Sequence, residues 1–224
     1  TAEGNALVIR QTAAVGAAPL VGVQWALGVV PSSVAVLVPG NSGLRFGPGA
    51  PDGDWSFEYP VGWEAQFVLL QGKRGGFLIW SDDQAGRFKT LWLNRRAGRA
   101  RLAFETRADA PFSAVERLRS VTWRVQPYQG SWLEGARLYR EWAEQAYGLA
   151  AIRARRPAWM ARIRCVVIAP LDRALLEDLA QRLQPAETLL YVPHWRRDGY
   201  DRNYPDYTAV PEFGPWCERA RALG

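Results

Sequence analysis

The 224-residue sequence is poor in the side chains that most often carry recognisable chemistry. It holds two cysteines, Cys165 and Cys217, and a single histidine, His194. No CxxC pair and no Cys/His cluster occurs, which excludes a structural zinc site of the usual ligand types. A Ser-His-Asp triad is excluded unless His194 serves in it. We therefore expect neither a metal nor another cofactor.

Lysine is as scarce as cysteine. Only Lys73 and Lys89 are lysines among the 28 basic residues, and the formal net charge is +6. The arginines are scattered, with short clusters at residues 95–96 and 153–156. A nucleic-acid binder gathers its charge on one face or tail. We therefore expect no nucleic-acid partner, and a coding bias towards arginine explains the excess better than a polyanion site does.

Long hydrophobic runs are also missing. No apolar run approaches the ~20 residues that span a membrane, so we expect no membrane partner, and the compartment stays open between secreted and cytoplasmic. Apolar residues make up 48% of the chain and charged residues 22%, which is typical of a globular protein. The length allows one large domain, or a medium domain and a small one, but falls short of the roughly 250 residues of a closed β/α barrel.

The first part of the chain, residues 1–130, reads as short strands separated by Gly, Pro, Asp and Asn turns. These strands are rich in Val, Leu, Phe and Trp. We expect them at residues 6–10, 21–30, 33–38, 65–71, 76–81, 87–94, 99–106 and 120–126. Many short strands with almost no helical period predict an antiparallel β-sandwich. Residues 40–54 are expected to form a long Gly/Pro loop, and Asp82 and Asp83 a turn rather than a site.

A connecting segment, residues 131–157, follows the sandwich. Apolar side chains recur three and four residues apart from residue 131 to residue 147, which predicts an amphipathic helix. Ser131 is its expected N-cap, with Glu134 completing a capping box, and Gly148 its expected C-cap. The aromatic stripe of Trp132, Tyr139 and Trp142 is expected to pack on the sandwich. Residues 152–157 are expected to be a basic linker.

The last part, residues 158–224, changes pattern again. Continuous apolar runs at residues 163–169 and 188–192 are typical of strands buried on both faces, so Cys165 is expected in the core. Helical patterns follow each run, at residues 171–184 and 212–223. This β-α-β-α order predicts a parallel sheet, with an unpaired, exposed strand edge.

The segment after the second of these runs has the most distinctive composition in the chain. It follows the carboxyl end of a parallel strand, where open α/β sheets and β/α barrels build their sites. Its aromatic rings suit sugar faces, and its carboxylates, amide and guanidinium suit sugar hydroxyls. These side chains are Trp195, Tyr200, Tyr204, Tyr207, Asp198, Asp201, Asn203, Asp206 and Arg202. A sugar site and a packed Ω-loop remain equally open on composition. Asp201 and Asp206 are close enough in sequence to form a glycosidase pair, but the sequence does not place them across one cleft.

Three stretches resemble one family. Residues 199–207 (GYDRNYPDY) resemble the loop after the second barrel strand of bacterial glycoside hydrolases that are distantly akin to endo-α-N-acetylgalactosaminidases and α-galactosidases. Residues 75–93 (GGFLIWSDDQAGRFKTLWL) and 132–147 (WLEGARLYREWAEQAY) are similar to a sandwich strand pair and a joining helix of that family. The resemblance implies a sandwich of the galactose-mutarotase type, followed by the start of a (β/α)8 barrel, and retaining hydrolysis of α-linked sugars.

The resemblance also limits which residues can be assigned. In that family the catalytic nucleophile and acid lie on later barrel strands, which no residue here matches. We expect the catalytic nucleophile and acid, and the rest of the barrel, to lie in a part of the protein that follows residue 224. The loop matches only a region that binds carbohydrate. The residues expected to bind substrate are Asp201 first, then His194, Trp195 and Asp206, with Tyr204 and Arg202.

Two hypotheses follow. The leading one is the N-terminal part of a glycoside hydrolase, which by itself would not cleave glycosides. The alternative is a non-catalytic carbohydrate-binding or structural β-sandwich protein. Nucleic-acid binding is a distant third hypothesis.

Overall fold

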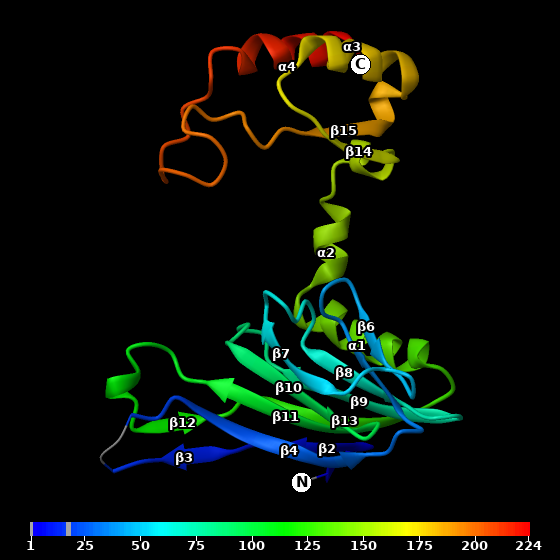
Figure 1. The fold of residues 1–224 in the computed structure, drawn as a ribbon, viewed down its shortest axis with the longest axis vertical. Coiled ribbons are helices and arrows are strands. Elements are labelled where there is room, and N and C mark those ends of the chain that lie inside the picture. Colours follow the sequence, from blue (N-terminus) through cyan, green and yellow to red (C-terminus); the bar gives the residue numbers. More distant parts are fainter. Residues whose placement is uncertain (1, 17–18) are drawn as a thin grey trace. The chain divides into compact units, whose positions relative to one another are not determined.

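The computed structural model describes residues 2–16 and 19–224, which divide into two compact units, Thr1–Ala150 and Ala151–Gly224. Figure 1 shows the course of the chain through both units. The helix α2 (Leu149–Ala154) crosses the boundary between them. No helix in the described part of the chain is long and apolar enough to cross a membrane.

The first unit contains two antiparallel sheets packed face to face. The seven-stranded sheet has the order β1-β2-β13-β9-β8-β5-β6, and the four-stranded sheet the order β4-β11-β10-β7. The strands of the first sheet are β1 (Ala2–Glu3), β2 (Ala6–Ile9), β5 (Ala35–Val38), β6 (Leu44–Phe46), β8 (Phe67–Gln71), β9 (Gly75–Asp82) and β13 (Thr122–Gln129). Those of the second are β4 (Gly22–Val30), β7 (Gly53–Tyr59), β10 (Lys89–Arg96) and β11 (Arg99–Arg107). A small pair, β3 (Thr12–Ala14) with β12 (Arg117–Arg119), and a 3-10 turn at Phe112–Ala114 complete the unit.

The core lies between these two sheets. Alternate side chains of each strand point inward, as the period of two requires. Trp63 and Trp123 are fully buried there, with ring centroids 6.3 Å apart, and Phe104 lies 5.2 Å from Trp123. Burial of this shared cluster stabilises the sandwich, and the prediction of an antiparallel β-sandwich is confirmed.

One strand and the start of another lie in the segment that the sequence predicted as a loop. β6 and the first residues of β7 fall within residues 40–54, where Gly and Pro are frequent. In β7 the side chains of Trp55, Phe57 and Tyr59 alternate with exposed polar residues. This alternation is a strand pattern, and the adjacent turn residues obscured it.

Helix α1 (Trp132–Ala146) covers the outer face of the seven-stranded sheet. The Ser131 hydroxyl accepts a hydrogen bond from the Leu133 amide, as expected of an N-cap, and Gly148 has a positive φ of 60°. The Glu134 carboxylate bonds instead to Arg137, so the expected capping box is half formed. Tyr139 and Trp142 pack on the sheet, whereas Trp132 is 45% exposed, contrary to expectation, because it occupies the first position of the helix.

The second unit contains a two-stranded parallel sheet and two helices. β14 (Cys165–Ile168) pairs with β15 (Thr188–Tyr191), α3 (Arg173–Arg182) connects them, and α4 (Phe213–Ala222) ends the unit. Short 3-10 helices lie at Ala158–Ala161 and Pro185–Glu187. The Asp172 carboxylate caps α3 by accepting from the Leu175 amide, and Trp216 of α4 is buried with its indole 3.3 Å from the Asp172 carbonyl.

Two expectations for this unit are wrong. The strands are not buried on both faces: Val166 is 61% exposed and Ile168 70%, and Cys165 is only half-buried. Two helices cover one face of a two-stranded sheet and leave the other face open. The expected basic linker begins inside helix α2, since residues 149–154 contain good helix formers.

Candidate functional site

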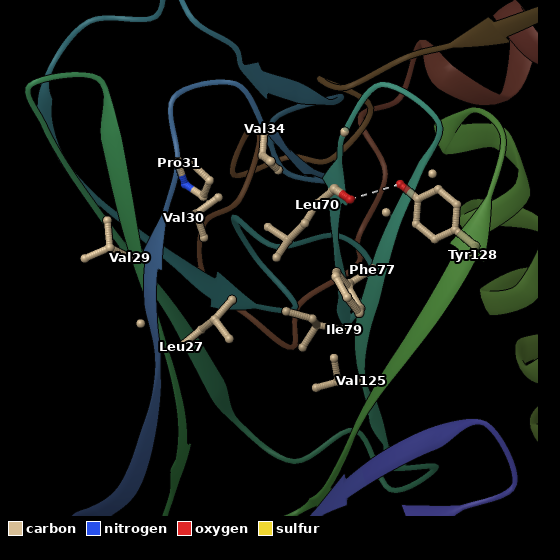
Figure 2. Close-up of a pocket in the computed structure, with 14 residues that line it drawn as sticks. Leu27, Val29, Val30, Pro31, Val34, Leu70, Phe77, Ile79, Val125 and Tyr128 are labelled. Atoms are coloured by element: carbon tan, nitrogen blue, oxygen red, sulfur yellow. Dashed lines mark hydrogen bonds between the residues drawn. The ribbon is translucent and has the colours of Figure 1, made fainter.

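An apolar hollow of the first unit lies at one end of the sandwich. Its volume is about 680 Å³, and its walls are apolar side chains from β4, β8, β9 and β13. Figure 2 shows Leu27, Leu70, Phe77 and Ile79 turned towards one another. The one side-chain hydroxyl there, on Tyr128, donates to the Leu70 carbonyl at 3.3 Å. None of the described residues that line this cavity carries a carboxylate, so it lacks the pair that glycoside hydrolysis uses.

The adjacent carboxylates Asp82 and Asp83 are both used by the structure of the sandwich. Asp82 ends β9 and accepts from the Trp142 indole at 3.0 Å and from Arg124 at 2.9 Å. Asp83 is buried against Lys89. These contacts attach helix α1 and neighbouring strands to one another, so both carboxylates have a structural role in the sandwich.

The candidate site is the loop that follows β15 in the second unit, residues 193–210, which we call the arginine-centred loop. Its ends pair like a short hairpin: the Arg197 amide donates to the Thr208 carbonyl, and the Val210 amide to the Trp195 carbonyl, each at 2.9 Å. The indole of Trp195 packs on Phe213 at the start of α4, with ring centroids 5.4 Å apart. The loop is therefore fixed at both ends at the carboxyl end of a parallel strand.

Arg196 organises the interior of this loop. It is 5% exposed, and its guanidinium donates to the carbonyls of Gly199, Arg202 and Asp206 at 3.2, 2.9 and 3.2 Å. The same group lies 4.3 Å from the ring centroid of Tyr204. One side chain thus hydrogen bonds to three carbonyls from different parts of the loop. Nothing in the sequence distinguishes Arg196 from neighbouring arginines, and sequence reasoning missed it.

Two polar residues of the loop have left-handed backbone conformations. Asp201 has φ 57° and Asn203 φ 51°, a region that Asn and Asp enter more readily than other non-glycine residues. The Asn203 amide donates to Asp198 at 3.0 Å, and the Tyr204 hydroxyl donates to Asp201 at 2.8 Å. The hydrogen bond to the Asp201 carboxylate raises the pKa of Tyr204 above its ordinary value.

A small hollow of about 110 Å³ lies within the loop. Its walls include Trp195, Asp201 and Tyr204, three of the residues that the sequence singled out, together with Arg196. The other lining residues are Tyr191, Val192, Pro193, Tyr200 and Tyr207. Ligand pockets typically have volumes of roughly 300–1,000 Å³, so this hollow is smaller than a typical ligand pocket.

The other three singled-out residues do not line the hollow. His194 is exposed, with its ring 6.2 Å from that of Tyr200. The Arg202 side chain is exposed, and the Arg202 carbonyl accepts a hydrogen bond from Arg196. Asp206 forms an ion pair with Arg197 and accepts from the Thr208 amide at 2.8 Å. Hydrogen bonds from Thr208 and the nearby Arg197 guanidinium lower the pKa of Asp206.

The described residues contain no group of three His, Cys, Asp or Glu side chains placed to hold a metal ion. The arginine-centred loop offers carboxylate and amide groups that can hydrogen bond and aromatic rings that can stack. Such groups are suited to a sugar, because sugar hydroxyls bond to carboxylates and sugar C–H faces pack on rings.

The fold has counterparts among solved structures, whereas no family model matches and no curated protein matches the sequence. The chain is similar to the α-N-acetylgalactosaminidase NagBb of Bifidobacterium bifidum in its GalNAc complex, with a TM-score of 0.70 and 12% identity over 98% of this chain and 42% of that one. For the quadruple mutant of that enzyme, the TM-score is 0.60 and the sequence identity 13%, over 85% of this chain and 37% of that one. The chain thus spans less than half the length of these structures, and it shares their fold over that span.

Proposed function

We propose that this chain is the N-terminal part of a retaining glycoside hydrolase that acts on α-linked sugars. In this proposal the first unit is a sandwich of the galactose-mutarotase type, and the second unit supplies the first two β/α units of a (β/α)8 barrel. The observation that carries the proposal is the position of the arginine-centred loop. It follows the carboxyl end of a parallel strand, where β/α barrels bind substrates, in a chain whose fold is similar to that of an α-N-acetylgalactosaminidase.

The geometry of the second unit supports an incomplete barrel. Val166, Ile168, Leu189 and Tyr191 expose one face of the parallel pair, at 61%, 70%, 42% and 46%. Strands of a parallel sheet are normally covered on both faces and paired at their edges. Further β/α units of the same protein would cover this face and pair with its edges.

The loop supports a role in substrate binding rather than in bond cleavage. Asp201 and Asp206 each already have partners, the Tyr204 hydroxyl for one and Arg197 with Thr208 for the other. Only Asp201 lines the hollow, so the two carboxylates do not face each other across it. In the proposal the nucleophile and the acid lie outside these 224 residues, and Asp201 with Trp195 and Tyr204 holds a sugar ring. His194, Arg202 and Asp206 lie at the rim.

The second candidate function is non-catalytic carbohydrate binding. The observation that favours it is the same pairing of every loop carboxylate, because a paired carboxylate can still accept from sugar hydroxyls but is poorly placed to act as an acid or base. Both candidates predict sugar binding, and only the first predicts cleavage.

The test measures hydrolysis of p-nitrophenyl α-N-acetylgalactosaminide and p-nitrophenyl α-galactoside. It compares the 224-residue chain with the product of the whole reading frame that encodes it. We expect cleavage by the longer protein only, with the α-anomer as first product in proton NMR. Asp201→Asn should raise KM in the longer protein about tenfold, while Asp109→Asn, an exposed aspartate of the first unit, should leave KM unchanged.

Three outcomes would contradict the proposal. Cleavage by the 224-residue chain would place the catalytic groups inside it. A β-anomeric first product would exclude the retaining mechanism for α-glycosides. Sugar binding without cleavage by the longer protein would favour the second candidate.

A further inference from the structure

A large aromatic side chain lies exposed on the outer face of the four-stranded sheet in the first unit. Trp92 of β10 is 40% exposed there, although the other outward residues beside it are small. Its cross-strand neighbours are Ser56 on β7 and Ala103 on β11, and Ala103 is paired in turn with Ala26 on β4. Residues opposite one another on adjacent strands project from the same face of a sheet. The indole therefore stands above a row of small side chains.

The indole of Trp92 is held in one orientation. Its Nε1 donates to the Glu105 carboxylate at 3.0 Å, and Glu105 lies 3.5 Å from Arg107. Because the only donor of the indole is already satisfied, the exposed part of the ring offers an apolar surface. A fixed aromatic surface beside small residues is suited to the C–H face of a sugar ring, because little side-chain entropy is lost on contact.

Polar groups lie in the next row of the same face. Asn94 is paired with Asp54 on one side and with Arg101 on the other. The Asp54 carboxylate bonds to Asn94 and lies 2.6 Å from Arg96, and these two hydrogen bonds lower the pKa of Asp54. Asp54 is therefore ionised and its charge is offset by Arg96.

Two arginines of this face have no acidic side chain paired with them among the described residues. Arg99 and Arg101 lie two residues apart on β11, both exposed. Neither guanidinium makes a hydrogen bond or an ion pair within the described part of the chain. Guanidinium groups bind carboxylate and sulfate oxygens with two parallel hydrogen bonds. The face thus combines an aromatic surface with unpaired positive charge.

Two hollows connect the aromatic and the cationic parts. One, of about 400 Å³, is lined by Trp92, Ala103, Asn94 and Arg101, among others. The other, of about 370 Å³, is lined by Val29, Asn94, Arg96, Arg99 and Arg101. The two hollows share Asn94, Arg101 and Val29, and a Cβ at Gly28 on the same side would meet nothing within 4 Å. The combined space is in the range of ligand pockets.

We propose that this face of the four-stranded sheet binds an acidic saccharide, with one sugar ring on Trp92 and an anionic group of the saccharide on Arg101 and Arg99. Asn94 and Asp54 lie between the two and bond to ring hydroxyls. This site lies wholly in the first unit and uses none of the residues of the arginine-centred loop. It can therefore be tested independently of glycoside cleavage.

The test titrates the full 224-residue chain with trigalacturonate and follows tryptophan fluorescence and heat by calorimetry. Neutral galactotriose and inorganic sulfate are titrated in parallel. We expect saturable binding of trigalacturonate and at least tenfold weaker binding of the other two. Trp92→Ala should weaken trigalacturonate binding about tenfold, and Arg101→Gln by about tenfold to a hundredfold.

Matched controls separate this site from general effects. Trp132→Ala removes an equally exposed tryptophan, and Arg117→Gln an exposed arginine of β12. Both should leave trigalacturonate binding unchanged, and Arg101→Gln, whose side chain contacts no partner, should leave the unfolding midpoint unchanged. No binding of trigalacturonate at 10 mM (about the weakest affinity measurable), equal binding of sulfate, or full binding by both variants would overturn the proposal.

Discussion

Lys89 and Asp83 form an ion pair inside the sandwich, with Nζ 2.7 Å from Oδ2 and the lysine side chain fully buried. The ammonium also donates to the Arg87 carbonyl at 2.6 Å and lies 4.4 Å from the ring centroid of Tyr59. Burial lowers the pKa of Lys89, and the hydrogen bond to Asp83 opposes that shift. The Asp83 carbonyl accepts from Gln66, which also bonds to Tyr147 beyond the end of α1. The pair is therefore part of a buried polar network that connects β10 to the helix.

We expect Lys89→Met to destabilise the chain by about 3–5 kcal/mol, because it leaves the Asp83 carboxylate buried without its cation. Urea unfolding followed by circular dichroism measures this loss. The double variant Lys89→Met/Asp83→Asn should recover part of it, since no uncompensated charge remains. Lys73→Met, at the only other lysine, is the control: Lys73 is exposed, and its loss should change the free energy of unfolding by less than about 0.5 kcal/mol.

Gly→Ala substitutions in two helices should have opposite effects. A Cβ at Gly135 of α1 would lie 2.6 Å from Leu69 Cδ2 and 2.7 Å from the Tyr128 ring, so Gly135→Ala should cost about 1–3 kcal/mol through overpacking. A Cβ at Gly214 of α4 would meet nothing within 4 Å, so Gly214→Ala should stabilise by about 0.5–1 kcal/mol. Thermal unfolding of both variants checks the signs. A stabilising Gly135→Ala would show that α1 does not pack closely on the sheet.

Alkaline pH should destabilise the sandwich, with Tyr128 as one contributor beside Tyr139 and Tyr147, whose pKa values burial also raises. Burial raises the pKa of Tyr128 to about 12, whereas an unfolded tyrosine titrates near 10. Between these values the unfolded state binds fewer protons than the folded state, so stability falls as pH rises, by up to about 1.4 kcal/mol per pH unit. Below pH 10 this contribution is fully present.

Tyr128→Phe should flatten the fall in stability between pH 10 and pH 12, as measured by urea unfolding at several pH values. Gln71→Met is the control, because it removes the 2.9 Å partner of the Tyr128 hydroxyl and keeps the phenol. It should retain the pH dependence. If both variants retain it, other groups cause the alkaline loss.

Arg196→Lys should loosen the arginine-centred loop without unfolding the sandwich. A lysine ammonium cannot donate to all three carbonyls and also stack on the Tyr204 ring as the planar guanidinium does. We expect the local opening free energy to fall by about 3 kcal/mol, so amide exchange at Gly199 and Val210 should be roughly a hundredfold faster. Arg202→Lys, at an exposed side chain, should leave exchange unchanged. Equal protection in Arg196→Lys would show that the loop does not depend on the guanidinium.

Local patterns were enough to predict most of the elements. The alternation in β10 and the three-and-four spacing in α1 are properties of each segment alone, and both elements lie within a few residues of their predicted positions. β6 and β7 escaped prediction because Gly and Pro are frequent beside them, and the pairing with β5 and β10 that stabilises them is not a local property. Strand pairing is decided by neighbours that are distant in sequence.

The arrangement of the candidate site was predicted less completely than the fold. Composition alone indicated Trp195, Asp201 and Tyr204, which meet at one hollow. The composition gave no reason to choose Arg196, because several arginines are near one another in sequence and only the folded loop shows which of them is buried inside it. Asp206 and His194 are similarly indistinguishable in sequence from residues that line the hollow, and the course of the loop places them elsewhere.

Because the chain has only two lysines and Lys89 is buried, the two lysines should differ in their reactivity with amine-reactive reagents. Lys73, in the turn between β8 and β9, is the only lysine side chain that such a reagent can reach while the sandwich is folded. A second lysine adduct can form only when Lys89 becomes exposed. Lysine acylation followed by mass spectrometry of the peptides therefore reports when Lys89 becomes exposed, and Lys73 is the one lysine through which the folded sandwich can be labelled.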